Sequence, residues 1–284
     1  MISQQMVFIV GCPRSGSSIL AECLGRNDDV LYLGEEGQDL WNLDGFLSRN
    51  DPYLEHHERF PDMVSPMLLN HIDAGLRAKM ALRSIQGFGR LDAPIILDKC
   101  PPNSLRIKFL LAIFPSAKFI HIIRDGRDVV CSLEPGLQDN EWHFAKPRHW
   151  RMIAGQPEPL RRASLLWRYI VNRVDSDLDD CPSDSHRRVL YDSLIASPHK
   201  TVGGLCRFMG IDSTDQQRKW AADNVSFQTN KGYNPPSQAH WTTDDHRNRI
   251  GRYKENLSGS DAEMVYAMLN VELRKYGYIY PRSN

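Results

Sequence analysis

Short apolar runs alternate with segments of helical periodicity along most of this chain. Four runs predict buried strands, at residues 6–11, 94–97, 118–123 and 188–191. After the first run, apolar residues recur at helical spacing over 17–24. Strands that alternate with helices predict an α/β fold, in which a mostly parallel central sheet is covered by helices on both faces.

Local signals place several helices between and after these strands. We expect one helix to begin at Pro101-Pro102-Asn103 and to stop before Pro115, and others over 128–133 and 165–174. The last helix is marked by a capping box that starts at Ser260 and by a terminal Gly277.

Two long stretches show no periodicity. Residues 134–160 are rich in Pro, Trp and His, and residues 226–250 are polar and contain two adjacent prolines. Loops of this length in a compact domain are often lids or binding loops. We therefore expect one domain over 1–284 in which these two segments cover a bound molecule.

Charge and composition narrow the function classes. The 284 residues contain 35 Lys and Arg against 35 Asp and Glu, which argues against a nucleic-acid partner or a charged membrane surface. The chain contains no apolar run of about 18 residues, so we expect no membrane span. The first residues lack the basic segment of a secretory signal. Six cysteines without a C-x-x-C pair favour a reducing, cytoplasmic location.

A glycine-containing loop connects the first predicted strand to the first predicted helix. It has the sequence GCPRSGSS over 11–18, with the glycine spacing of a Walker A loop. Ser17 stands where a nucleoside triphosphatase has the lysine that contacts its β- and γ-phosphates. Backbone N–H groups, the helix N-terminus and Arg14 can still surround a phosphate, although a Gly/Ser turn with a solvent-facing arginine is the alternative. The loop therefore predicts a 5′-phosphate site made of Arg14, Ser15, Gly16, Ser17 and Ser18.

A second cationic element follows the strand at 118–123. Arg124 lies at the strand end, and Ser132 follows eight residues later on the next helix. An arginine fork and a hydroxyl at the carboxyl end of a parallel strand can clamp a terminal phosphate. The alternative is an Arg124 side chain that pairs with Asp125 or Asp128.

Together the two elements resemble those of the sulfotransferases that use PAPS (3′-phosphoadenosine 5′-phosphosulfate). PRSGSS at 13–18 is similar to the family's 5′-phosphosulfate loop, P-[KR]-S-G-[TS]-[TS]. The stretch RDGRDVVCS at 124–132 is similar to the family's R-D-x-R-D-x-x-x-S segment, which holds the 3′-phosphate. The resemblance implies a P-loop-like sulfotransferase domain that uses PAPS as co-substrate, releases PAP and needs no metal. It also implies that Arg124 and Ser132 bind the 3′-phosphate.

Two later stretches agree with the resemblance. Residues 189–198 are similar to the family's strand–helix junction, which implies that Tyr191 lies near the adenine, although a packed core tyrosine fits equally. Residues 250–254, IGRYK, resemble a late G-R-W loop that closes over the nucleotide. The implied nucleotide contact there is Arg252, with Arg249 as second choice.

Sulfuryl transfer needs charge stabilisation at the bridging oxygen and a base for the acceptor proton. The resemblance implies Arg14 as one cation. It implies Lys99 as the other, in a setting similar to the family's D-K-x-P, with pairing to Asp98 as the alternative.

The histidine that serves as base in the hormone- and phenol-sulfating branch is missing here. Gly34-Glu35-Glu36 is instead similar to a G-E-E segment of the protein-tyrosine sulfating branch, and implies Glu36 as general base, with Glu35 second. A solvated acidic turn is the alternative, and His143 and His149 are weaker candidates.

Two other function classes stay open. A P-loop phosphotransferase predicts lysine at position 17 and a strand aspartate for Mg²⁺, for which Asp98 is a weak candidate. A non-catalytic module would bind PAPS or PAP without turnover. We expect an enzyme that moves the sulfuryl group to a hydroxyl or amine of a small-molecule acceptor, a metabolite or natural product.

Overall fold

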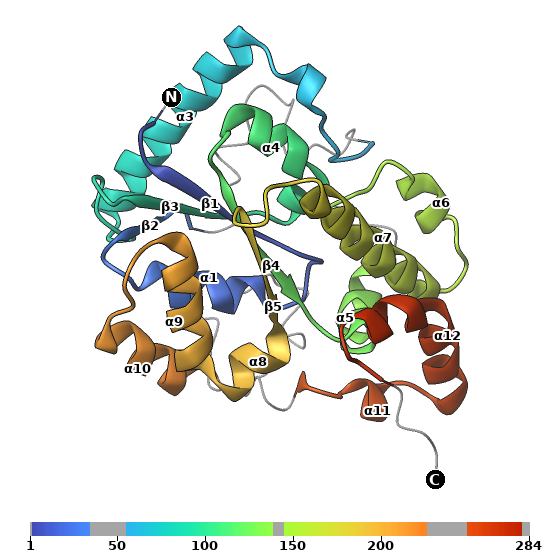
Figure 1. Ribbon diagram of the computed structural model, residues 1–284. Coiled ribbons are helices and arrows are strands. Elements are labelled where there is room, and N and C mark those ends of the chain that lie inside the picture. Colours follow the sequence, from blue (N-terminus) through green and yellow to red (C-terminus); the bar gives the residue numbers. More distant parts are fainter. Residues whose placement is uncertain (1, 35–54, 139–144, 226–248, 280–284) are drawn as a thin grey trace.

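A computed structural model describes residues 2–34, 55–138, 145–225 and 249–279 of the chain (Figure 1). Its strands are β1 (Gln5–Val10), β2 (Val30–Tyr32), β3 (Ile95–Lys99), β4 (Lys118–Ile123) and β5 (His186–Leu190). Its α-helices are α1 (Ser17–Gly25), α3 (Pro66–Ile85), α4 (Ile107–Ile113), α5 (Gly126–Leu133), α6 (Trp150–Ala154), α7 (Pro159–Asp179), α8 (Tyr191–Ala196), α9 (Pro198–Met209), α10 (Asp215–Asn224), α11 (Tyr253–Asn256) and α12 (Gly259–Lys275). Short 3₁₀ helices lie at η2 (Pro61–Met63), η3 (Pro101–Leu105) and η4 (Glu134–Leu137).

The strands form one parallel sheet in the order β2-β3-β1-β4-β5. The chain first builds β2 and β3 on one side of β1, and then crosses to build β4 and β5 on the other. Parallel α/β sheets bind ligands outside the carboxyl ends of their strands, at the point where the strand order reverses. In this sheet that point lies beside the end of β1.

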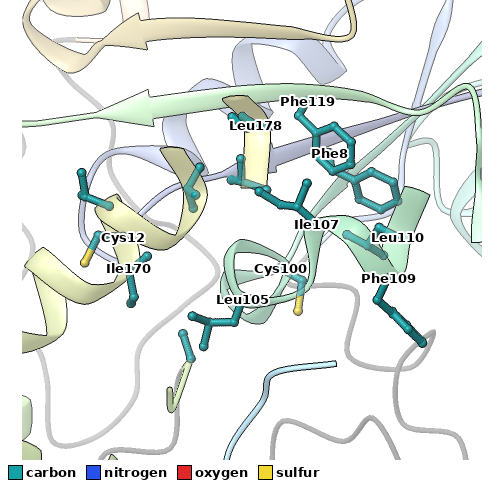
Figure 2. Close-up of a cluster of buried hydrophobic side chains, with 14 of the residues drawn as sticks. Phe8, Cys12, Cys100, Leu105, Ile107, Phe109, Leu110, Phe119, Ile170 and Leu178 are labelled. Atoms are coloured by element: carbon teal, nitrogen blue, oxygen red, sulfur yellow. The ribbon is translucent and has the colours of Figure 1, made fainter. Parts of the chain in front are cut away.

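Helices cover both faces of the sheet, as the fold-class prediction requires. Alternate residues of β1 point to opposite faces: Phe8 joins a large buried cluster with α3, α4, α5, α7 and α12, whereas Ile9 joins a smaller one with α1, α8, α9 and α10. Figure 2 shows part of the large cluster, where the rings of Phe8 and Phe119 stack with their centroids 5.5 Å apart. The predicted α/β architecture is confirmed.

The element predictions hold for the four strands and most of the helices that follow them. The structure adds β2, which is three residues long, and α3, which begins at the N-cap Ser65 with Pro66 in its first turn. The helix expected from Pro101 is split into η3 and α4 at the fully buried Arg106. The capping box at Ser260 is wrong by two residues, because Ser258 accepts the hydrogen bond from the Asp261 N–H.

Part of the stretch predicted to be a long loop at 134–160 is built from helices. It contains η4, α6 and the start of α7, and Trp150 lies in the large buried cluster. Residues 145–148 are also anchored: the His57 N–H donates to the Lys146 carbonyl (2.8 Å), and the Arg148 N–H donates to Glu58 (2.7 Å). Residues 139–144, with His143, and most of 226–250 lie outside the described residues.

None of the helices within the described ranges combines the length and apolar character needed to cross a bilayer.

Candidate functional site

The predicted phosphate loop lies between β1 and α1, at the point where the strand order reverses. Its start is fixed by Ser104 of η3, whose hydroxyl accepts from the Gly11 N–H (2.9 Å) and donates to the Gly11 carbonyl (2.8 Å). A hydrogen bond from the Ser15 N–H to the Cys12 carbonyl (3.2 Å) closes the turn. The loop is therefore held from a segment far away in the sequence.

Three residues of the loop have a positive φ, Gly11 (149°), Arg14 (73°) and Gly16 (95°). Gly16 is the N-cap of α1 and has no side chain to satisfy the first N–H groups of the helix. Ser17 and Ser18 form the first turn, which contains no acidic residue. An uncapped helix N-terminus attracts an anion, so this geometry suits a phosphate.

Tyr191 packs directly on the loop. A Cβ atom at Gly16 would lie 2.5 Å from a ring carbon of Tyr191, so no larger residue fits there without displacement. Tyr191 is buried at the start of α8, and burial raises the pKa of its phenol to about 12. The ring is both a packed residue and a wall of the loop.

Arg124, at the end of β4, joins three segments of the chain. It is 3% exposed, and its guanidinium donates to the carbonyls of Arg14 (3.3 Å) and Arg249 (2.5 Å). Its Cζ atom lies 4.7 Å from the centre of the Tyr191 ring. Arg124 therefore lies where the phosphate loop, α8 and the segment at 249 meet.

Ser132 lies on α5 and contacts the phosphate loop directly. Its hydroxyl accepts a hydrogen bond from Arg14 Nε at 3.0 Å. The sequence had assigned these two residues to opposite ends of a nucleotide. The structure brings the two predicted phosphate-binding elements into direct contact.

Of the two carboxylates considered as alternative partners of Arg124, Asp128 is within ion-pair distance of it, whereas Asp125 pairs with Arg127. Asp125 makes a bidentate ion pair with Arg127, whose Nε donates to Oδ1 (2.9 Å) and whose Nη2 donates to Oδ2 (2.6 Å). Asp128 lies 3.7 Å from Arg124 and accepts from the Gly251 and Tyr253 N–H groups (2.8 and 3.1 Å). Burial raises the pKa of Asp128 while the Arg124 charge opposes that rise. Asp128 thus ties the chain after residue 249 to α5, and Arg124 keeps a direct contact with the loop.

Arg249, the second choice of the sequence reasoning, is the residue brought next to Arg124 and Tyr191. Its side chain is buried, and burial together with the charges of Arg124 and Arg252 lowers its pKa to about 10. Arg252 is half-buried at the N-cap of α11, directly before Tyr253. Positive charge concentrated in this way favours a bound anion.

Lys99 is the last residue of β3 and is buried in register with Ile9 of β1. Asp98 lies on the opposite face of the sheet, in register with Phe8, and accepts from Asn103 (2.7 Å). The Lys99 side chain therefore leaves the sheet on the face of α1, at the edge where the phosphate loop lies.

The two glutamates proposed as bases, Glu35 and Glu36, lie outside the described residues. The chain that leads to them is described: the Leu33 N–H donates to the Leu97 carbonyl (2.9 Å). This bond extends the pairing beyond β2, so that Gly34 lies beside the end of β3. His149, a weaker candidate, is exposed and packs edge-on against Tyr169.

Two contributors to the site were missed from the sequence. Ser104 was not singled out because no local pattern indicates its contact with Gly11, 93 positions earlier. Asp128 was considered only as a partner of Arg124, because no local pattern indicates that it accepts from the N–H groups of Gly251 and Tyr253, 123 and 125 positions later.

Comparison with known proteins gives a consistent family. The protein-family model described as "Sulfotransferase family" matches residues 6–215 of this chain. A protein-tyrosine sulfotransferase from Drosophila melanogaster is 21% identical over 210 residues, which are 74% of this chain and 39% of that protein. The omega-hydroxy-beta-dihydromenaquinone-9 sulfotransferase Stf3 from Mycobacterium bovis is 24% identical over 72% of this chain and 53% of its own length. The chain thus spans about half the length of these relatives, or less.

Solved structures share the fold at lower sequence identity. The sulfotransferase domain of the Synechococcus PCC 7002 olefin synthase has a TM-score of 0.58 and 18% identity, with 99% of this chain and 98% of that chain covered. A retinol dehydratase has a TM-score of 0.52 and 13% identity, with 99% and 84% covered. With the family model matching well over half of its residues, the chain belongs to the sulfotransferase family.

Proposed function

We propose that this chain transfers the sulfuryl group of PAPS to a hydroxyl or amine of a small-molecule acceptor. The observation that carries the proposal is the contact between the two phosphate-binding elements. Arg14 of the loop donates to Ser132 of α5, and Arg124 donates to the Arg14 carbonyl. A nucleotide with anionic groups at both its 5′ and 3′ positions matches such a surface, whereas ADP or ATP carries its phosphates at one end only.

Each residue then has a role in binding the donor. Backbone N–H groups of the loop and the hydroxyls near the start of α1 bind the 5′-phosphosulfate, and Tyr191 lies along the adenine. Arg252 contributes to the loop that closes over the nucleotide. The 3′-phosphate is bound by Arg124, Ser132 and Arg249.

In the proposed reaction, PAPS supplies the sulfuryl group, whose sulfur bonds to the acceptor atom as its bond to the bridging oxygen breaks and PAP leaves. Arg14 and Lys99 stabilise the negative charge that develops on that oxygen. Glu36 takes the acceptor proton. The position of Gly34 beside the end of β3 supports this role, because Lys99 ends the same strand.

Two of the proteins to which the chain is similar support a small hydroxylated acceptor, whereas the name of the Drosophila relative gives a protein tyrosine. The name of Stf3 gives a hydroxylated menaquinone derivative as its acceptor, and the retinol dehydratase was solved with retinol and PAP. We further propose one sulfotransferase domain over 1–284, whose segments 134–160 and 226–250 cover the acceptor. The cytoplasmic location stays a prediction from the cysteine pattern, testable by cell fractionation.

Calorimetric titration with PAP, ADP and AMP, without added metal, tests the nucleotide class. PAP is expected to bind much more tightly than ADP, because only PAP carries the 3′-phosphate. Equal binding of ADP and PAP would favour the phosphotransferase instead. Tight binding of PAP with no turnover of PAPS on any acceptor would favour the non-catalytic module.

Arg124→Ala is expected to weaken PAP binding by about 1.5–3 kcal/mol, the range for a lost hydrogen bond to a charged group. Arg124→Lys keeps the positive charge but not the planar guanidinium, so its loss of PAP-binding free energy should be smaller than that of Arg124→Ala. Arg274→Ala, on the exposed face of α12, is the control for a general charge effect. An unchanged dissociation constant in Arg124→Ala would remove Arg124 from the donor site.

A further inference from the structure

A groove runs along the outer edge of the sheet. It has a volume of about 550 Å³ and lies between β5 and the helices α8 and α9. Four consecutive residues of β5, 187–190, line one side. Small residues line the other, among them Ser197, which connects α8 to α9, and Gly204 of α9. The phosphate loop and the other residues assigned to the donor do not contribute to it.

The backbone of β5 is available on the groove side. Within the described part of the chain, β5 pairs only with β4, so it is an edge strand of the sheet. A parallel ladder engages alternate residues of a strand, and an edge strand therefore presents a second row of N–H and C=O groups without a strand partner. Such a row is a template for an added strand.

Four cations line this groove, and three of them have no carboxylate partner among the described residues. Val189 packs into the smaller buried cluster with α9, so Arg187, two residues earlier in the strand, leaves the sheet on the same face. Lys200 and Arg207 reach the groove from α9. All three side chains are exposed, and in the described ranges none has an ion pair. Arg188 points to the other face, where Asp179 and Asp175 neutralise it (2.7 and 3.3 Å).

The lining of the groove contains no carboxylate, so its positive charge is not balanced locally. The whole chain has a formal net charge of zero, which makes this patch a local feature. We propose that the groove binds an acidic, extended segment of another polypeptide, which adds as a strand to β5 and places carboxylates toward Arg187, Lys200 and Arg207. This goes beyond the proposed sulfuryl transfer and does not depend on it.

A peptide fits these features better than a nucleic acid. Three cations release few counterions, and counterion release is the main source of non-specific affinity for nucleic acids. The edge backbone offers donors and acceptors in the spacing of a β-strand, which only another peptide backbone matches along its length. Main-chain bonds would supply affinity, and the cations would select acidic side chains.

Fluorescence anisotropy with a labelled peptide tests the proposal. The peptide alternates glutamate with valine or threonine, and it is titrated with the full chain at low ionic strength. We expect saturable binding that weakens with added salt. Lys200→Glu/Arg207→Glu should weaken it by at least about tenfold, since charge reversal replaces attraction by repulsion. Absence of binding at low salt would overturn the proposal.

Matched controls separate strand addition from general charge. Arg90→Glu/Arg274→Glu carries the same charge change away from the groove and should bind like the unmodified chain. A peptide methylated on alternate backbone nitrogens keeps its carboxylates but cannot complete the ladder, and should not bind. Equal binding of the methylated peptide would overturn strand addition, and tighter binding of a single-stranded oligothymidylate would show a general polyanion site instead. Melting curves of both double variants confirm that they fold.

Discussion

At Arg14 the chain places a charged residue in a left-handed conformation that residues other than glycine seldom adopt. Such a backbone costs on the order of 1 kcal/mol, and it persists only when neighbouring contacts maintain it. Here Arg124 holds the Arg14 carbonyl and Ser132 holds its side chain. The strain therefore lies at the residue proposed to stabilise the leaving group.

Gly16→Ala tests how tightly the loop is packed. Its Cβ atom would meet the Tyr191 ring at 2.5 Å in a left-handed backbone. We expect a loss of about 2–3 kcal/mol in the free energy of unfolding, measured by urea titration. Gly210→Ala is the matched control, because Gly210 also has a positive φ (85°) but nothing within 4 Å, so only the smaller backbone cost should appear. Equal losses in the two variants would contradict the packing.

Glu36→Gln tests the proposed base. The amide keeps the size and polarity of the side chain but cannot take a proton, so turnover should fall by about 10²-fold or more while PAP affinity stays the same. Steady-state assays and calorimetry measure the two effects separately, and Glu35→Gln is the neighbouring control. Full activity in Glu36→Gln would discard the assignment.

Between elements, the packing of β4 against α7 buries an unusual group. His121 is fully buried on β4, and its Nδ1 lies 3.6 Å from Asp175 of α7. Burial is the main cause that lowers the pKa of His121 to about 3. The Asp175 carboxylate opposes this lowering, whereas the charges of Arg188, Lys275 and His186 contribute to it. The folded protein therefore keeps this imidazole neutral through the mildly acidic range.

A dependence of stability on pH follows. The unfolded chain takes up a proton at His121 near pH 6.5, whereas the folded chain does so only near pH 3, so the free energy of unfolding should fall as the pH drops between these values. From pH 7 to pH 5 the contribution is about 2 kcal/mol. Urea titrations at both values should show a smaller drop for His121→Gln than for the natural chain. His199→Gln, at an exposed position of α9, should keep the full drop, and an unchanged drop in His121→Gln would contradict the assignment.

Elements with strong local signals could be predicted from the sequence, and those that depend on distant contacts could not. The strand before the phosphate loop, β1, and the strand before Arg124, β4, have continuous apolar runs bounded by clear turns. β2 has only three residues, too few to show a period. The helix α3 was missed although Ser65 and Pro66 mark its start, because its buried positions include Lys79 among polar neighbours. The proximity of Arg249 to Arg124 depends on packing between distant segments, which no local pattern encodes.

For the molecule as a whole, we expect one cooperative unfolding transition. PAP at 100 times its dissociation constant should stabilise the fold by about 2.7 kcal/mol, and calorimetric scans should show the single transition move up by several degrees. ADP at the same concentration is the control. Two transitions, of which PAP moves only one, would contradict the proposal of a single domain.

The hydroxyl of Ser104 has a consequence for how the chain is made. It holds both backbone groups of Gly11, yet a ribosome adds Gly11 93 residues before Ser104. During synthesis the phosphate loop therefore emerges without the contact that fixes its start. It gains that contact only after β3 and η3 have followed it. A growing chain that stops before Ser104 carries the whole PRSGSS motif but does not have the finished loop. The start of the phosphate loop is thus fixed only once Ser104 has been translated, although PRSGSS is among the first sequences to be made.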